Sequence, residues 1–192
     1  MTPKKTPIAA IAFCAAFAIC SPGLGQSLSI LEERAAQIDE LLDELARPDL
    51  ETWEATENRI VGLWSRSGSE SIDLLLERGQ NALEAEEYQT AVEHLTAVTD
   101  HAPDFAEGWQ LRATAFFNLG EYGLALDDLE VALRLNPKHF GALAGLGVVL
   151  EEAGNFEVAL KAFEYARELN PHRELITDAI ERLESRLGKA RL

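Results

Sequence analysis

Three prolines in the second half of the chain are separated by one fixed interval, and this interval constrains the fold more than any other feature. Pro103, Pro137 and Pro171 lie 34 residues apart. The residues between them form three aligned segments without insertions: 72–105, 106–139 and 140–173. A fixed period of this size is typical of proteins built from stacked repeats, in which each unit buries its apolar face against its neighbours.

Other positions of the segment also carry the same kind of side chain in each copy. Small residues stand at the eighth position (Gly79, Ala113, Gly147) and at the twentieth position (Ala91, Ala125, Ala159). An aromatic residue stands at the seventeenth position (Tyr88, Tyr122, Phe156). This pattern resembles the tetratricopeptide repeat (TPR) family, whose signature is a 34-residue period with small, aromatic and proline residues at such positions. The resemblance covers 102 of the 192 residues and indicates three tandem repeats.

The resemblance implies an all-α fold, a right-handed α-solenoid in which each repeat is a pair of antiparallel helices. The small residues at the eighth and twentieth positions would let the two helices of a pair approach closely. Gly120 and Gly154 stand at the turn between these helices, where a left-handed residue commonly ends a helix. The first repeat has Glu86 at this position, so we expect a looser turn there.

The segments on either side of the repeats are also predicted to be helical. In residues 26–71, apolar residues at helical spacing predict a first helix up to Ala46, and Pro48 separates it from a second helix of about 50–65. We expect this N-terminal hairpin to cover the open end of the first repeat, or to be a degenerate repeat itself. Its two tryptophans, Trp53 and Trp64, are interpreted as core residues more readily than as partner anchors. At the other end, residues 174–192 predict a capping helix with a polar outer face and a short tail.

The first 25 residues have the pattern of a secretory signal peptide. Lys4 and Lys5 precede an uncharged apolar run, and small residues lead to a predicted cleavage after Gly25. An uncleaved anchor and a lipid on Cys20 are weaker alternatives, because the apolar run is short for a membrane span and bulky residues precede the cysteine. Removing residues 1–25 would leave no cysteine and would take the formal net charge from −16 to −18. Such a chain repels nucleic acid and anionic lipid. The absence of any Asn-x-Ser/Thr acceptor favours a bacterial periplasm.

The resemblance also indicates where a partner would bind. In the family, four positions of the first helix of each repeat face the concave side of the solenoid, and their spacing keeps them on one helical face. Ten residues at these positions are the candidate partner-binding set: Asp73, Leu76, Gln80, Leu83, Glu107, Gln110, Thr114, Phe117, Val148 and Glu151. None of them is Lys or Arg, whereas family members that grip carboxylate tails use Lys, Arg and Asn there. The pattern therefore favours a neutral or basic peptide or helical segment. Small residues beside them, such as Gly141 and Ala144, are also explained by tight helix packing alone.

Signals of catalysis are weak throughout the sequence. The four histidines do not pair with acids or with one another at metal-site spacing, and His139 and His172 near the repeat junctions are expected to cap helix ends or lie in solvent. No phosphate-binding loop, nucleophile elbow or cofactor motif occurs. We therefore expect a non-enzymatic, cofactor-free scaffold or adaptor. The alternatives are an envelope protein that assembles into homo-oligomers and a non-catalytic subunit of an enzyme complex.

Overall fold

Helices make up the regular structure of the protein. A computed structural model describes the backbone of residues 22–188 and the side chains of residues 32–188, and these residues form nine α-helices and no strand. In chain order the helices are α1 (Pro22–Leu45), α2 (Trp53–Trp64), α3 (Glu70–Glu84), α4 (Tyr88–His101), α5 (Ala106–Asn118), α6 (Tyr122–Leu135), α7 (Phe140–Glu152), α8 (Phe156–Leu169) and α9 (Glu174–Arg186).

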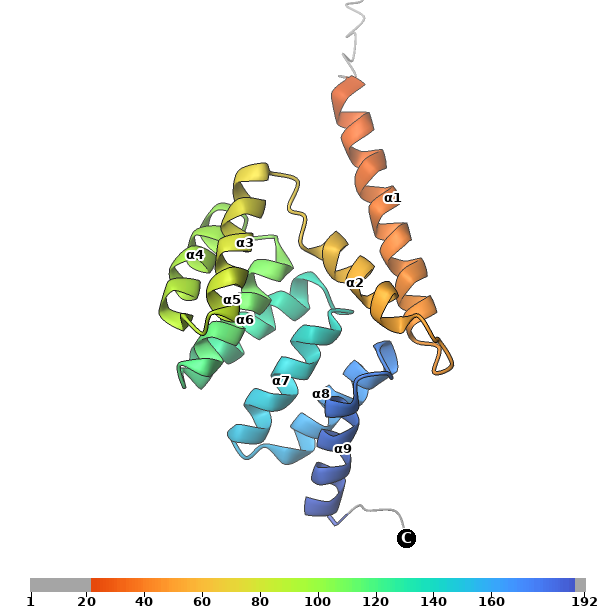
Figure 1. Cartoon of the computed structure of the whole chain (residues 1–192), viewed down its shortest axis with the longest axis vertical. Coiled ribbons are helices and arrows are strands. Elements are labelled where there is room, and N and C mark those ends of the chain that lie inside the picture. The colour runs from red at the N-terminus through yellow and green to blue at the C-terminus, as the bar shows by residue number, and fades with distance from the viewer. Residues whose placement is uncertain (1–21, 189–192) are drawn as a thin grey trace, which may run out of the picture.

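Helices α3 to α9 form one continuous stack. Each 34-residue segment contributes an antiparallel pair: α3 with α4, α5 with α6, and α7 with α8. The second helix of each pair packs on the first helix of the next, and α8 packs on α9 in the same way (Figure 1). The predicted all-α solenoid is thereby confirmed. The count of three repeats stays a prediction, because α1 and α2 form a further antiparallel pair.

Small residues set the distance between the helices of a pair. A Cβ atom on Gly79 of α3 would lie 2.6 Å from the side chain of Leu95 on α4. A Cβ atom on Gly147 of α7 would lie 2.8 Å from the ring of Phe163 on α8. Non-bonded carbon atoms are ordinarily about 3.5–4.0 Å apart, so only glycine fits at this separation. The large side chains above these glycines are buried and belong to the cores of their repeats.

The turns inside the three pairs have the same conformation. Gly120 and Gly154 adopt φ angles of 78° and 77°, and Glu86 adopts 59° at the equivalent place. The amide of Glu86 donates to the carbonyl of Leu83, as the amide of Gly120 donates to Phe117. The expectation of a looser first turn is therefore wrong. Because the following amide also bonds back to the helix in each case, the hydrogen bonds hold the turn closed even where a side chain makes the left-handed conformation unfavourable.

The N-terminal hairpin packs on a different surface from the one expected. Leu41, Leu42 and Leu45 of α1 and Ile60 of α2 form a buried cluster with Phe140, the first residue of α7. Trp64 stacks on His139 with 4.4 Å between ring centroids, and Trp53 stacks on His172 at 5.5 Å. The hairpin thus lies against the loops that join α6 to α7 and α8 to α9. The expectation that it covers the open end of the first repeat is wrong, because these loops offer the aromatic and apolar partners that its two tryptophans and four aliphatic residues need.

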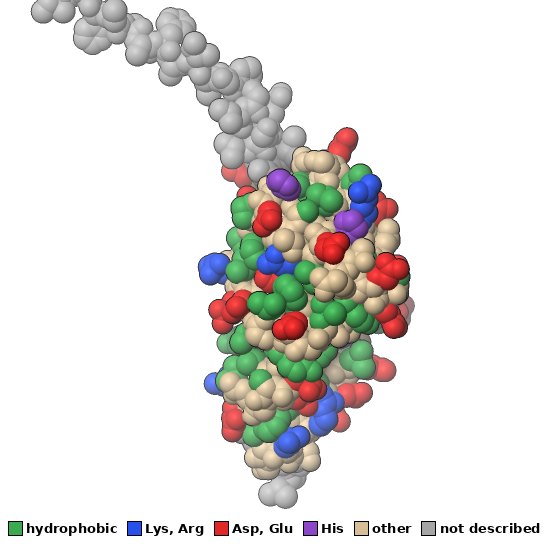
Figure 2. Space-filling view, turned by 90° about the vertical axis from the view of Figure 1, so that its left-hand side faces the viewer, with side chains coloured by type: hydrophobic (Ala, Val, Ile, Leu, Met, Phe, Trp, Pro, Cys, Tyr) green, Lys and Arg blue, Asp and Glu red, His purple; other side chains and the backbone are tan. Residues whose placement is uncertain are grey.

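The structure describes the two ends of the chain only in part. Residues 1–21, which hold most of the predicted signal peptide, and residues 189–192 of the predicted tail lie outside the described residues. Helix α1 begins at Pro22, so the predicted cleavage after Gly25 falls in its first turn. Among the helices of residues 22–188, none combines the length and the apolarity that a bilayer crossing requires. On the face shown in Figure 2, acidic side chains are scattered among hydrophobic ones, in line with the formal net charge of −16.

The left-handed conformation of Glu86 leads to a stability prediction. Replacing Glu86 by Gly should raise the free energy of unfolding by about 1 kcal/mol, because glycine adopts a positive φ without the steric cost of a Cβ atom. The measurement is urea denaturation followed by circular dichroism. Glu87→Gly is the matched control: Glu87 has a φ of −84°, so the same change one residue later should lower stability. An equal effect of the two substitutions would contradict the prediction.

Candidate functional site

Two pockets adjoin along the face that the first helices of successive pairs share. The larger pocket has a volume of about 460 Å³ and lies between α7 and α9. The smaller pocket has a volume of about 190 Å³ and lies between α5 and α7. Gly145 and Val148 of α7 line both pockets, so the two form one depression, called the groove below. The groove runs across α5, α7 and α9, so a ligand on the inner face of the solenoid would lie along it.

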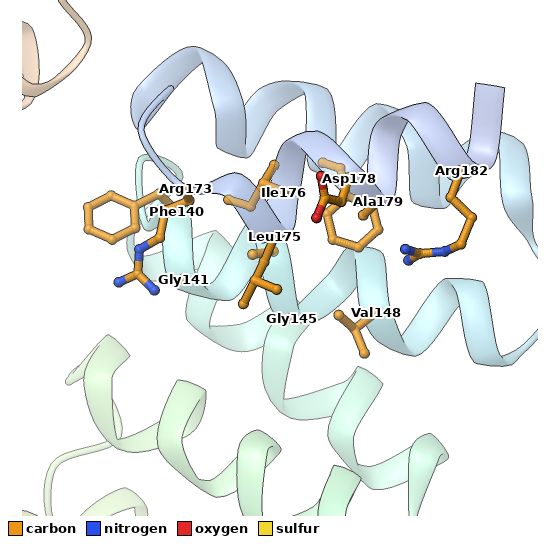
Figure 3. Close-up of a pocket in the computed structure, with 12 residues that line it drawn as sticks. Phe140, Gly141, Gly145, Val148, Arg173, Leu175, Ile176, Asp178, Ala179 and Arg182 are labelled. Atoms are coloured by element: carbon orange, nitrogen blue, oxygen red, sulfur yellow. The ribbon is translucent and has the colours of Figure 1, made fainter. Parts of the chain in front are cut away.

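The middle of the larger pocket is apolar. Figure 3 shows Leu175 and Val148 between Arg173 at one end and Arg182 at the other. The side chain of Leu175 is 81% exposed, although leucine is normally buried. The absence of side chains at Gly141 and Gly145, together with Ala144 between them, leaves the space that the pocket occupies. This arrangement suits an apolar side chain supplied by another molecule.

Glutamates neutralise both arginines of this pocket. Glu151 of α7 accepts from Arg182 Nε at 2.9 Å and from Arg182 Nη2 at 2.8 Å. The hydrogen bond from Arg182 holds the pKa of the Glu151 carboxyl below its ordinary value of 4.5. Glu57 of α2 accepts from Arg173 Nε at 3.0 Å. The groove therefore contains two cations but little uncompensated positive charge.

Three of the ten predicted partner-binding residues line the groove. Thr114 and Phe117 of α5 belong to the smaller pocket, and Val148 belongs to both. Phe117 is half-buried and tilts against Tyr122, with 5.5 Å between ring centroids. Glu151 borders the groove through its ion pair with Arg182.

The other six predicted residues do not line either pocket. Leu76 is 1% exposed and belongs to the core of the first pair. Glu107 is buried and lies 2.9 Å from the ring of His139. Asp73 accepts hydrogen bonds from the amide and hydroxyl of Ser67, while Gln80, Leu83 and Gln110 are half-buried on α3 and α5. Of the ten residues, Leu76 and Glu107 are therefore closed to a ligand in this structure, and partner binding by the remainder stays a prediction.

Sequence reasoning missed the contribution of α9. Leu175, Asp178 and Arg182 line the larger pocket from this helix, which had been expected only to cap the stack. They stand one 34-residue step beyond Gly141, Ala144 and Val148, at the same three groove positions. Extending the repeat register past residue 173 would have found them. The capping helix is therefore also a wall of the groove.

The described residues offer no metal centre. Within them, no group of three His, Cys, Asp or Glu side chains could hold an ion. His139 has a structural role: its Nδ1 accepts from the amide of Ala142 at 3.2 Å, so the ring caps the start of α7 as expected.

The Glu151–Arg182 pair leads to a prediction about pH. A carboxyl with a lowered pKa in the folded state stabilises the fold above its unfolded pKa, and this stabilisation is lost as the pH falls through the folded value. Arg182→Gln should therefore cost up to about 1 kcal/mol at neutral pH, a modest value because Arg182 is largely exposed. The difference from the unchanged protein should vanish well below pH 4.5. Urea denaturation at several pH values measures this difference, and Lys161→Gln at an exposed position of α8 is the charge-matched control. A stability difference between Arg182→Gln and the unchanged protein that persists at low pH would contradict the role assigned to the Glu151–Arg182 ion pair.

Comparison with known proteins agrees with this architecture. A family model described as tetratricopeptide repeat matches residues 76–139 and 111–174. A TPR repeat-containing protein of Rhizobium etli is 33% identical over 168 residues, which cover 83% of this chain and 81% of that protein. Superkiller complex protein 3 of Mus musculus is 36% identical over 109 residues, but the match covers 56% of this chain and 6% of that protein.

Solved structures give the same result. The first TPR of Spaghetti (RPAP3) bound to the HSP90 peptide SRMEEVD has a TM-score of 0.60 and 25% sequence identity, and the match covers 62% of this chain and 95% of that one. The family model spans more than half of the chain, and the Rhizobium etli protein matches most of its length. The chain therefore belongs to the tetratricopeptide repeat family.

Proposed function

We propose that this protein is an exported, non-catalytic scaffold or adaptor that binds a neutral or basic segment of another protein in its groove. The observation that carries the proposal is the pair of adjoining apolar pockets across α5, α7 and α9, with Leu175 exposed at the rim. Exposed apolar surface with a few charged groups around it is typical of sites that bind another protein. Together the pockets have room for several apolar side chains of an extended or helical segment.

Charge supports the choice of a neutral or basic segment. The chain has a formal net charge of −16, which attracts cations and repels anions over a distance of about 10 Å at moderate ionic strength. Both arginines of the groove are paired with glutamates, and Asp178 is an exposed acid on its wall. A segment with apolar residues and one or two Lys or Arg would therefore complement the groove.

The RPAP3 structure supports the mode of binding but not the same ligand. That protein is bound to an HSP90 peptide, SRMEEVD, which is acidic at its C-terminal end. The ten predicted groove positions of this chain include no Lys or Arg. We therefore expect a segment of this kind to bind more weakly than its uncharged counterpart.

Site-specific photo-crosslinking in living cells tests the proposal. A benzophenone amino acid at Val148 should capture a partner, because this position lies at the centre of the groove. The matched control is Val158 of α8, which is 44% exposed and lines neither pocket. Capture from Val148 alone is expected. Equal capture from both positions would contradict groove binding, and a product that consists of two copies of this chain would favour the homo-oligomer alternative.

Export leads to a separate prediction. If residues 1–25 are a signal peptide, protein recovered from the periplasm of a bacterial host should begin at Gln26, with no cysteine and no lipid. Intact-mass spectrometry of the purified protein measures this. A mass that includes residues 1–25, or protein found only in the cytoplasm, would contradict export.

A further inference from the structure

The hairpin and the groove share two residues. Phe140 lines the larger pocket and is also a member of the buried cluster formed by α1 and α2. Arg173 lines the same pocket and donates to Glu57 of α2. The surface that holds the hairpin is therefore continuous with one end of the groove, where Figure 3 places Arg173.

Glu57 occupies a carboxylate site built by the repeats. Its carboxylate accepts from Asn170 Nδ2 at 2.7 Å and from Arg173 Nε at 3.0 Å, with a further bond from Arg173 Nη2. Asn170 is fully buried, and the Glu57 side chain is 9% exposed. An arginine fork and an amide donor form the kind of charge-assisted set that binds a carboxylate strongly. Arg173 keeps 46% of its side chain exposed, so a ligand would reach it if Glu57 did not hold it.

The opposite end of the pocket repeats this arrangement with different residues. Arg182 of α9 is 56% exposed and is held by Glu151 of α7 in a two-bond contact. Between the two pairs lie apolar side chains, including Leu175 and Val148. Each cation that lines the larger pocket is thus engaged by a carboxylate of the chain itself.

We infer that Glu57 and Glu151 determine which segments the groove accepts, by masking Arg173 and Arg182 from carboxylates of a ligand. Glu57 reaches Arg173 from the hairpin, so docking of α1 and α2 sets the specificity of the groove end that they border. The inference rests on the proposed function, because it assumes that the groove receives a protein segment. In addition to that proposal, Glu57 and Glu151 cause the groove to select against acidic segments, because each holds one of the arginines that would otherwise bind a carboxylate.

The test compares one acidic peptide with a counterpart that has no carboxylate side chain or C-terminal carboxylate. The probes are fluorescein-labelled SRMEEVD and SRMQQVN with an amidated C-terminus, and fluorescence anisotropy with the full mature chain gives the affinity for each. Glu57→Gln should bind the acidic peptide roughly fivefold more tightly than the unchanged protein does, because it frees one partly desolvated guanidinium. Affinity for SRMQQVN should change less than twofold. The gain should diminish with added salt, which a purely structural effect would not produce.

Two variants serve as controls. Glu54→Gln removes the same charge from an exposed position of α2, three residues before Glu57, and should leave both affinities unchanged. Adding Arg173→Gln to Glu57→Gln should abolish the gain.

Emission of Trp53 and Trp64, which stack on the repeat loops, reports whether the hairpin stays docked. If Glu57→Gln loosens the hairpin, Glu151→Gln carries the same prediction through Arg182, which is far from the hairpin in sequence and is bonded to Glu151 of α7.

The outcomes separate the inference from the proposed function. The inference would be overturned if Glu57→Gln with a docked hairpin, or Glu151→Gln, showed no gain in affinity for the acidic peptide. It would also be overturned if Glu54→Gln showed a gain equal to that of Glu57→Gln. Neither result affects groove binding of the natural partner, which the crosslinking from Val148 decides. A gain in the variants without capture from Val148 would instead support the masking and contradict the proposed function.

Discussion

The contact between a glycine on one helix and a large apolar side chain on the next is the interaction on which this structure depends. Gly79 beneath Leu95 and Gly147 beneath Phe163 bring the two helices of a pair close enough to share one core. A small residue recurs at this position with the 34-residue period (Gly79, Ala113 and Gly147), so successive pairs meet in the same orientation. The first helices then line up, and the pockets between α5, α7 and α9 follow from their alignment. A side chain in place of either glycine would separate its pair, and at Gly147 it would also displace Phe163, which lines the groove.

Sequence reasoning recovers what is periodic and local. The helix pairs and their order follow from residues that recur at fixed positions, and the turn at Gly120 follows from one glycine. The place of the hairpin could not be predicted, because its contacts join residues far apart in the sequence, such as Glu57 and Arg173. A pattern of apolar residues at helical spacing shows that α1 and α2 need a partner surface. It does not say which surface is offered.

The groove was predictable only in part, for a related reason. Thr114, Phe117 and Val148 line it because the neighbouring helix leaves space beside them. At two other predicted groove positions, neighbouring residues fill that space: Leu76 of α3 joins the first core, and Glu107 at the start of α5 is bound by His139. A position in the repeat of the family fixes the direction in which a side chain points. The exposure of that side chain depends on the residues that surround it.

The central claim is that the inner face of the stack, and no other surface, receives the partner. Amide chemical shifts of the labelled protein, recorded while the captured partner segment is added, test this most directly. The account predicts that the perturbed amides lie on α5, α7 and α9, around Val148 and Leu175. Perturbations centred on α4, α6 and α8 would contradict it.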